Sequence, residues 1–570
     1  MSLRRSNRRI RLLIAVFAAV FSVTFLRAAW LQAVQARSLG RLAADQHRET
    51  MPLPAHRGTI YDRTGAVLAI GERAVTVAAD PRQISNPRSV AIAVGHALGI
   101  EPGKLLPLLA DRSRGFVYLA RKADPADVAP LERRGIAGLE FTPEERRSYP
   151  QKEVGAEVVG FAGTDNHGLA GMELQYDAAL AGRDGSETTI RDPFGRTLQT
   201  LREERVRDGR DAYLTLDHAL QAQVERILRE TKAKWGAKSA TAVVMDPRSG
   251  GILAMAVEPG YDANEFAEVR GDLQRNRAVT DTFEPGSTFK VVTIGGALAS
   301  GLVAPTTRYT LPPSIRIADR VIHDAEERPT ETMTVARILS QSSNVGVITV
   351  ALGLGKTHLN DWIARFGFGR PTGIDFPGES PGIVLPPEKW SGSTIGNVPI
   401  GQGIAVTPMQ MLGAYGAIAN RGAWVQPHLL DRVAGGRRFR PERRRVLPTQ
   451  TADELTRMLE DVVAEGTGTL AFVPGYQVAG KTGTAAKPEP GGGYSDSRYV
   501  ASFVGFVPAE RPRLVILVTV DEPRGAIWGG AVAAPAFSEI ARFGLQYLEV
   551  PPDSRVTADS VSTSNVTAGG

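Results

Sequence analysis

Glu284-Pro-Gly-Ser-Thr-Phe-Lys290 holds the only Ser-x-x-Lys pattern of this 570-residue chain. The Pro-Gly pair can turn the backbone into a helix that begins near Ser287. A spacing of three residues then places the Ser287 hydroxyl and the Lys290 amine on one helix face. A helix N-terminus is electropositive and depresses the pKa of a nearby ammonium, so Lys290 is a candidate base for a serine nucleophile without any histidine. A helix cap beside a surface lysine is the alternative for this motif alone.

Two later segments carry side chains that suit the same chemistry. Residues 342–344 are Ser-Ser-Asn, a hydroxyl and an amide that could relay a proton and bind a substrate amide, although a polar turn between helices would also use them. Residues 481–484 are Lys-Thr-Gly-Thr in a strand-like run. There Gly483 allows the backbone of a ligand to approach, and the lysine and hydroxyls can hold a carboxylate. A phosphate-binding loop does not fit, because no strand–loop–helix context follows.

The excess positive charge of the chain is concentrated at its N-terminus. There are 67 Lys and Arg against 61 Asp and Glu, a net charge of +6, and five arginines with no acid lie in residues 1–11. A polyanion-binding protein would spread this excess over a folded face, so we expect no nucleic-acid partner. The chain has no cysteine, its eight histidines are scattered and His-Glu-x-x-His does not occur, so we expect no metal and no cofactor.

An apolar segment follows these arginines. Residues 12–31 span about 30 Å as a helix, which matches the hydrocarbon core of a membrane, with Arg27 extending to the far interface beside Trp30. A cleaved signal peptide ending near Ala36 is the alternative. The positive-inside rule places residues 1–11 in the cytoplasm and the body of the chain outside. The sequence therefore predicts a single-pass protein of the cytoplasmic (inner) membrane with an extracytoplasmic body.

The body of the chain has an α+β pattern. Residues 56–210 alternate short β-branched runs with Gly, Pro and Asp turns, and no histidine or acid there lies at catalytic or metal-binding spacing. After a strand-like run at 213–217 comes an amphipathic segment at 218–232. Further strand-like runs at 241–246, 251–257, 499–507 and 514–521 enclose a long region of helix signals. This order predicts one α+β domain whose sheet joins distant segments.

The three motifs, taken in this order, resemble the signatures of penicillin-binding proteins and related β-lactamases. Residues 57–69, Arg-Gly-Thr-Ile-Tyr-Asp-Arg-Thr-Gly-Ala-Val-Leu-Ala, resemble the hallmark of the pedestal in class B (monofunctional) penicillin-binding proteins. The resemblance covers residues 10–545. It implies a single N-terminal transmembrane helix, an α+β pedestal domain, and an α+β penicillin-binding/serine β-lactamase-like transpeptidase domain with a central antiparallel sheet and helices. The expected limits are 1–11 for a cytoplasmic arm, 12–31 for the transmembrane helix, 32–210 for the pedestal, 211–548 for the transpeptidase domain and 549–570 for a disordered tail.

The resemblance also implies an activity, peptidoglycan D,D-transpeptidation through an acyl-enzyme, with β-lactams trapping the same serine. Its expected partners are the D-Ala-D-Ala stem peptides of peptidoglycan, a membrane-embedded glycan polymerase and other division proteins. The implied roles are Ser287 as nucleophile, Lys290 as general base, Ser342 as proton relay, Asn344 as ligand of the penultimate amide, Lys481 and Thr482 as ligands of the terminal carboxylate, Gly483 as space for the substrate strand, and the N–H groups of Ser287 and Thr484 as oxyanion hole.

Several alternatives stay open at this point. A class A β-lactamase needs Glu-x-x-Leu-Asn, and the nearest match, residues 356–360, has lysine in place of the glutamate. A D,D-carboxypeptidase shares all three motifs. A non-catalytic penicillin-binding receptor or septal scaffold is disfavoured by the intact Ser287, Lys290 and Lys481. Asparagine at 344 favours a division-specific enzyme over an elongation-type one, and a sporulation-type relative would share this feature.

Overall fold

The computed structural model describes residues 3–35, 48–191, 197–489 and 491–553. The chain forms two compact units, one of residues 1–56 and 182–209 and the other of residues 57–181 and 210–570. The domain limits drawn from the sequence stay a prediction.

The first unit contains the apolar helix. Helix α1 (Leu3–Trp30) continues into a π-helical turn (Leu31–Gln35), and residues Arg8–Ala33 are long and apolar enough to cross a membrane, with a mean hydropathy of 2.2 over an 18-residue window. Its large apolar side chains are exposed, and those of Phe21 and Phe25 are more than two-thirds exposed, as expected for a helix whose partner is lipid. The predicted arm does not precede the helix but forms its first turns, because no proline or glycine interrupts it.

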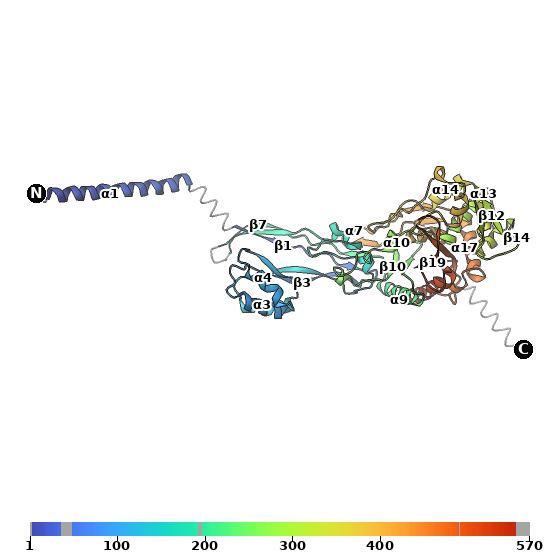
Figure 1. The fold of residues 1–570 in the computed structure, drawn as a ribbon, viewed down its shortest axis with the longest axis horizontal. Helices are drawn as coiled ribbons and strands as arrows, with labels where there is room; N and C mark the ends of the chain where they lie inside the picture. Colours follow the sequence, from blue (N-terminus) through green and yellow to red (C-terminus); the bar gives the residue numbers. More distant parts are fainter. Residues whose placement is uncertain (1–2, 36–47, 192–196, 490, 554–570) are drawn as a thin grey trace. The chain divides into compact units, whose positions relative to one another are not determined.

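A three-stranded antiparallel sheet completes the first unit. It has the order β1-β6-β7, with β1 at Arg48–Leu53, β6 at Gly185–Arg191 and β7 at Thr197–Glu204. Two segments that are far apart in sequence therefore pair here. Figure 1 labels β1 and β7 of this sheet.

The second unit begins with a sheet of the order β16-β8-β2-β3-β4, in which β5 also pairs with β3. Helices α3, α4 and α5 pack at the β3–β5 end around a small apolar core that includes Val77, Val94 and Leu131. Short helices α6, α7 and α8 follow β5. The bounds are β2 Ile60–Tyr61, β3 Val67–Ala79, β4 Val117–Ala123, β5 Leu139–Ser148, β8 Ala212–Leu214, β16 Leu430–Val433, α3 Pro87–Leu98, α4 Pro102–Ala110, α5 Pro125–Arg134, α6 Ala156–Val159, α7 Gly171–Gln175 and α8 Asp177–Leu180.

A second sheet of this unit has the order β10-β9-β20-β19-β18, and all of its neighbouring strands are antiparallel. Its strands are β9 (Ser239–Met245), β10 (Ile252–Glu258), β18 (Ala479–Pro488), β19 (Tyr494–Val507) and β20 (Leu514–Asp521). The prediction of a sheet that joins distant segments is confirmed. The strand-like run at 213–217 is not part of it, because β8 pairs with β2 and β16 in the other sheet.

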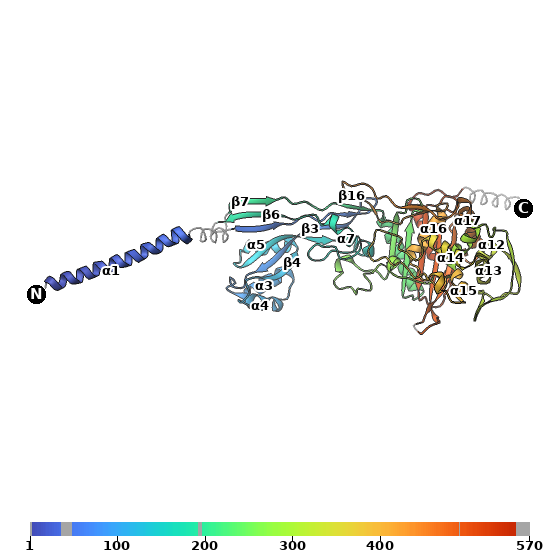
Figure 2. The ribbon, with the colours of Figure 1, turned by 90° about the horizontal axis from the view of Figure 1, so that it is seen from above.

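Helices cover both faces of the β10–β18 sheet. Figure 2 labels α16 and α17 among the helices of this region. Helices α9 (His218–Lys234) and α19 (Ala534–Tyr547) pack on one face, where Leu228 and Phe537 are buried. Helix α16 (Pro408–Ala419) packs on the other. The remaining elements are α10 Arg277–Thr280, α11 Lys290–Ala299, α12 Val335–Ser340, α13 Asn344–Leu354, α14 Lys356–Phe366, α15 Thr394–Asn397, α17 Thr449–Ala464 and α18 Gly529–Val532, and the strand pairs β11 Arg308–Leu311 with β14 Glu331–Thr334, β12 Ser314–Ile317 with β13 Arg320–His323, and β15 Ala423–Val425 with β17 Arg443–Arg445.

The ordered chain extends beyond the predicted domain end at residue 548. The Tyr476 hydroxyl donates to the Val550 carbonyl at 2.5 Å, and the Gln477 N–H donates to the Asp553 carboxylate at 2.7 Å. These contacts hold residues 549–553 against the loop before β18, so they are not part of a disordered tail. The rest of the predicted tail, 554–570, lies outside the described residues.

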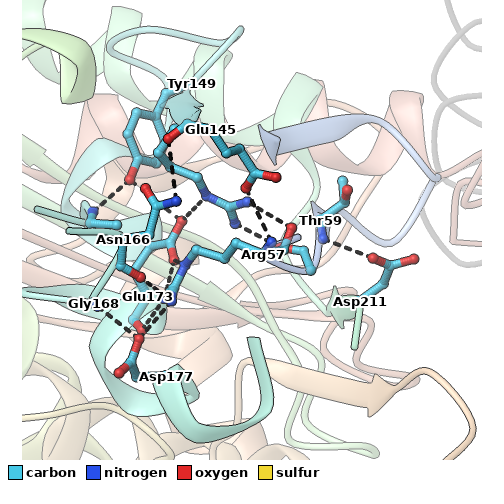
Figure 3. Close-up of polar contacts among 12 residues, drawn as sticks. Arg57, Thr59, Glu145, Tyr149, Asn166, Gly168, Glu173, Asp177 and Asp211 are labelled. Atoms are coloured by element: carbon cyan, nitrogen blue, oxygen red, sulfur yellow. Dashed lines mark hydrogen bonds and ion pairs between the residues drawn. The ribbon is translucent and has the colours of Figure 1, made fainter. Parts of the chain in front are cut away.

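The hallmark arginine of the predicted pedestal lies in a buried ionic network (Figure 3). Arg57 donates from Nε to the Glu173 carboxylate at 2.7 Å and from Nη1 to Asp177 at 2.6 Å. Arg147 donates to the other carboxylate oxygen of Glu173 at 2.6 Å. Because the Glu173 side chain is fully buried and those of both arginines nearly so, these hydrogen bonds supply the solvation that water would otherwise give.

Backbone groups complete this network. The Arg57 N–H donates to the Glu145 carboxylate at 3.1 Å, and Arg147 Nη2 donates to the Gly58 carbonyl at 2.9 Å. The Tyr149 hydroxyl lies 3.4 Å from Glu173 and accepts from the Ala162 N–H at 2.7 Å. The network thus ties the segment before β2 to β5 and α7, which explains why the hallmark begins with arginine.

We predict that Arg147→Ala lowers the free energy of unfolding by about 3 kcal/mol, because it leaves the buried Glu173 carboxylate one cation short. Arg146→Ala is the matched control on the same strand, since Arg146 is 44% exposed and pairs with Glu72 in solvent. We expect this control to change stability by less than about 0.5 kcal/mol. Urea unfolding of the two variants measures both values, and equal effects would contradict this account of the network.

Candidate active site

The Ser-x-x-Lys motif forms the start of a helix, as the sequence predicts. A 3-10 turn at Gly286–Phe289 leads directly into α11, with Lys290 as its first residue. Gly286 has φ +54° and donates its N–H to the Gly401 carbonyl at 3.0 Å. The Thr288 carbonyl accepts from the buried Tyr415 hydroxyl at 3.0 Å. These contacts fix the turn and leave Ser287 partly exposed while Lys290 is fully buried.

The ammonium of Lys290 is held by the second motif. Its Nζ donates to the Ser342 carbonyl at 2.5 Å and to the Asn344 Oδ1 at 2.7 Å, and it lies 3.2 Å from the Ser342 hydroxyl. Burial lowers the pKa of Lys290 to about 7, and the nearby Asp324 carboxylate opposes this shift. An amine with this pKa exchanges protons readily at neutral pH.

Residues 342–344 are a polar turn between α12 and α13, which was the alternative for this motif, and they also face Lys290. Ser342 has φ +58°, and the Ser343 hydroxyl caps α13 by accepting from the Gly346 N–H at 3.0 Å. The Asn344 amide donates to the His323 carbonyl at 2.9 Å, so its oxygen is directed to Lys290. This segment is therefore both a polar turn between helices and a set of polar groups in contact with Lys290.

Lys481 is the second buried lysine of the site. It lies on β18 and is fully buried, with its Nζ 3.2 Å from the Thr482 hydroxyl and 3.4 Å from the Thr467 hydroxyl. The Thr467 and Thr482 hydroxyls are 2.7 Å apart. Burial lowers the pKa of Lys481 well below its usual value, and the nearby Lys290 lowers it further. An anion bound beside Lys481 would favour its charged form and offset the cost of burying it.

Gly483 brings β18 against the Ser287 turn. A methyl group at this position would lie 2.8 Å from the Pro285 carbonyl and 2.9 Å from the Thr288 side chain, so only glycine allows this approach. On the next residue, the Thr484 hydroxyl accepts from the Gly529 N–H at 3.0 Å. A cavity of about 680 Å³ continues from here, between Ala485 and Ala486 on β18 and Glu284 before the turn.

The structure brings together most of the residues that the sequence singled out. Direct hydrogen bonds join Lys290 to Ser342 and Asn344, Ser287 lies on the same turn as Lys290, and Thr482, Gly483 and Thr484 follow Lys481 on the adjoining strand. Sequence reasoning missed Asp324, whose carboxylate accepts from the Ser343 hydroxyl and the Val345 N–H, both at 2.9 Å. No pattern marks this aspartate. It also missed Thr467, which the Gly-Thr-Gly-Thr run at 466–469 could have indicated.

One group of potential metal ligands occurs among the described residues, outside this site. Ligand atoms of Asp62, Asp217 and His218 lie within 4.8 Å of one another. They are already satisfied, because His218 Nδ1 is 2.7 Å from the Asp62 carboxylate and Arg63 donates to Asp217 at 3.1 Å. They form a structural hydrogen-bond cluster between the β2–β3 connection and the start of α9.

Comparison with known proteins matches both regions of the chain. Residues 240–542 match the penicillin-binding protein transpeptidase domain and residues 52–214 the penicillin-binding protein dimerisation domain. The chain is 34% identical to a protein of Pseudomonas aeruginosa named "Probable peptidoglycan D,D-transpeptidase PbpC", over 99% of both chains. It is 37% identical to penicillin-binding protein PbpB of Mycobacterium tuberculosis, over 94% of this chain and 84% of the relative.

A solved structure shares the fold. The crystal structure of penicillin-binding protein 3 from Mycobacterium tuberculosis complexed with aztreonam superposes with a TM-score of 0.71 at 33% identity, covering 88% of this chain and 98% of that one. The chain contains the apolar helix α1, the sheet of β2, β3, β4 and β5 in the pedestal region, and the β10–β18 sheet with its helices. These elements agree with the predicted fold class. The domain matches, the full-length similarity and the shared fold show that this chain belongs to the class B penicillin-binding proteins.

Proposed function

We propose that this chain is a peptidoglycan D,D-transpeptidase that cross-links stem peptides through an acyl-enzyme on Ser287. The observation that carries this proposal is the environment of Lys290. Its amine is buried, is held between the Ser342 carbonyl and Asn344, and has a pKa of about 7 one helical turn from the Ser287 hydroxyl. A neutral amine at that position is a base for the serine.

The reaction has two acyl-transfer steps. Ser287 Oγ attacks the carbonyl carbon of the D-Ala-D-Ala peptide bond while Lys290 accepts its proton. The proton passes, with the Ser342 hydroxyl as relay, to the leaving nitrogen, and free D-Ala departs. The amine of a second stem peptide then attacks the ester carbon, its proton returns through Lys290 to Ser287, and a new peptide bond replaces the ester.

Strand β18 supplies the substrate contacts in this proposal. Lys481 and Thr482 bind the terminal carboxylate of the donor, because a bound anion favours the charged form of a lysine whose pKa is lowered by burial. Gly483 leaves space for the peptide backbone, and Asn344 binds the penultimate amide. The N–H groups of Ser287 and Thr484 stabilise the oxyanion, the contribution that is usually largest in acyl transfer.

The membrane location and the partners follow from the N-terminal helix and the family. We propose that α1 anchors the protein in the cytoplasmic membrane, with the catalytic domain on the extracytoplasmic side, because five arginines precede the apolar span. The proposed role is septal wall synthesis at division, together with a membrane-embedded glycan polymerase. β-Lactams acylate Ser287 in this proposal, as the aztreonam complex of the similar protein suggests.

We predict that fluorescent penicillin labels the full-length chain covalently and that Ser287→Ala abolishes this labelling, because no ester can form without the hydroxyl. Gel fluorescence after denaturation measures the covalent product. Ser113→Ala, an exposed serine outside the site, is the control and should label like the parent chain. Persistent labelling of Ser287→Ala would contradict the assignment of the nucleophile.

The acylation rate should depend on pH through Lys290. Below a pKa of about 7 the amine is protonated and cannot accept the serine proton, so the rate should rise about tenfold per pH unit and level off above 7. Stopped-flow acylation between pH 5.5 and 9 measures this profile. Lys290→Arg should be inactive throughout, because guanidinium stays protonated. A flat profile for the parent chain would contradict Lys290 as the base.

The acceptor distinguishes a transpeptidase from a carboxypeptidase. We predict that polymerised lipid-linked precursor yields cross-linked dimeric muropeptides, because the cavity of about 680 Å³ lined by Ala485 and Ala486 of β18 offers room for a second stem peptide. Chromatography of muramidase digests measures the dimers, with a penicillin-treated sample as control. Release of D-Ala without dimers would instead show that water is the acceptor.

A further inference from the structure

A second cavity lies between the pedestal region and the transpeptidase domain, within the same compact unit. It has a volume of about 220 Å³, and its lining includes Glu153, Glu157, Glu225, Arg229 and Glu258. Glu157 belongs to helix α6, Glu225 to α9 and Glu258 to the end of β10. Four carboxylates from three distant segments thus meet around one guanidinium.

Glu157 is the unusual member of this group. Its side chain is almost completely buried, with an exposed fraction of 3%, and neither carboxylate oxygen has a hydrogen-bond partner. Its Oε1 is directed at Gly260, where a methyl group would lie 2.9 Å away. Burial raises the pKa of Glu157 well above its usual value, and the neighbouring Glu225 raises it further. The backbone N–H of Glu157 itself opposes this rise. A buried carboxylate with no donor from another residue is costly.

The other charges of the cavity do not compensate Glu157. The Oε1 of Glu225 accepts hydrogen bonds from the Gly155 N–H and from the Gln221 side chain, both at 2.8 Å. Arg229 is 56% exposed and donates to Glu153 at 3.0 Å, with Glu258 at 3.8 Å. The positive charge of this lining is therefore directed at the cavity rim, and its floor is left with two neighbouring carboxylates.

The chemistry of the lining selects the ligand. The side chains other than Arg229 offer only carboxylate oxygens, which are the preferred ligands of hard cations. The carboxylates of this cavity are not close enough together for three of them to bind one bare ion directly. Among the described residues, only Asp62, Asp217 and His218 have ligand atoms that close. A cation that keeps part of its hydration shell fits the wider spacing here, and Mg²⁺ is usually bound in this way, by one or two carboxylates plus water.

We propose that this cavity is a binding site for a hydrated divalent cation, with Glu157 as direct ligand and Glu225 and Glu258 as ligands of its coordinated water. The bound cation joins α6 of the pedestal region to α9 and β10 of the transpeptidase domain. Glu153 and Arg229 lie at the solvent-exposed rim through which the ion enters. This site is independent of the Ser287 chemistry.

The test is thermal unfolding of the full-length chain in detergent at pH 8, first in chelator and then with MgCl₂ or CaCl₂ at ionic strength matched with NaCl. Saturating cation should raise the midpoint by about 2 °C, because it binds only the folded protein. Glu157→Gln should abolish the shift, since its neutral amide removes the direct ligand. Glu230→Gln, an exposed acid on α9 outside the cavity, should retain it.

A second variant separates cation binding from a folding defect. Arg229→Gln removes the positive charge at the rim and should lower the cation concentration at half-effect several-fold. Penicillin labelling shows that each variant is folded. The proposal is overturned if the parent chain shows no cation-dependent shift beyond NaCl, if Glu157→Gln keeps the shift, or if Arg229→Gln weakens it.

Discussion

The contact between the 286–289 turn and strand β18 is the constraint on which the catalytic arrangement depends. The backbone at Pro285 and the backbone at Gly483 approach so closely that a single methyl group at 483 would collide with the Pro285 carbonyl. The φ of +54° at Gly286 provides the bend that makes this approach possible. Two glycines therefore set the separation between Ser287 and Lys481, and the side chains only exploit the space that remains.

This close packing also places two lysines in one buried environment, with the Asp324 carboxylate near Lys290. Lys290 is solvated by a carbonyl and an amide oxygen, and Lys481 by threonine oxygens, so both keep depressed pKa values. A bound carboxylate would reverse the effect on Lys481 by favouring its charged form. Substrate binding and protonation of Lys481 are thus coupled. Lys290 keeps a pKa of about 7, because the nearby Asp324 carboxylate opposes part of the effect of burial, and it can therefore act as a base.

Local sequence patterns predicted the helix at Ser287 and the strands of the β10–β18 sheet, and the family resemblance implied that the three motifs form one site. They succeeded because each motif is defined by a spacing that one helix turn or one strand converts directly into geometry. They failed where a contact depends on the path of the chain. Asp324 lies nineteen residues before Ser343 in a strand connection, β8 pairs with β2 and β16, which are far from it in the chain, and residues 549–553 are held by a distant loop.

Three buried ionisable groups of this molecule, Glu173, Lys290 and Glu157, have different kinds of partner. The kind of partner determines whether the group serves stability, catalysis or ligand binding. Glu173 is matched by two arginines, so its charge is permanent and serves stability. Lys290 is matched by neutral dipoles, which solvate an ammonium only partly, so its charge can be given up and recovered during a reaction. Glu157 is matched by nothing within hydrogen-bond distance. An unmatched buried carboxylate must acquire either a proton or a cation, and this third arrangement therefore suits a cation from outside the chain.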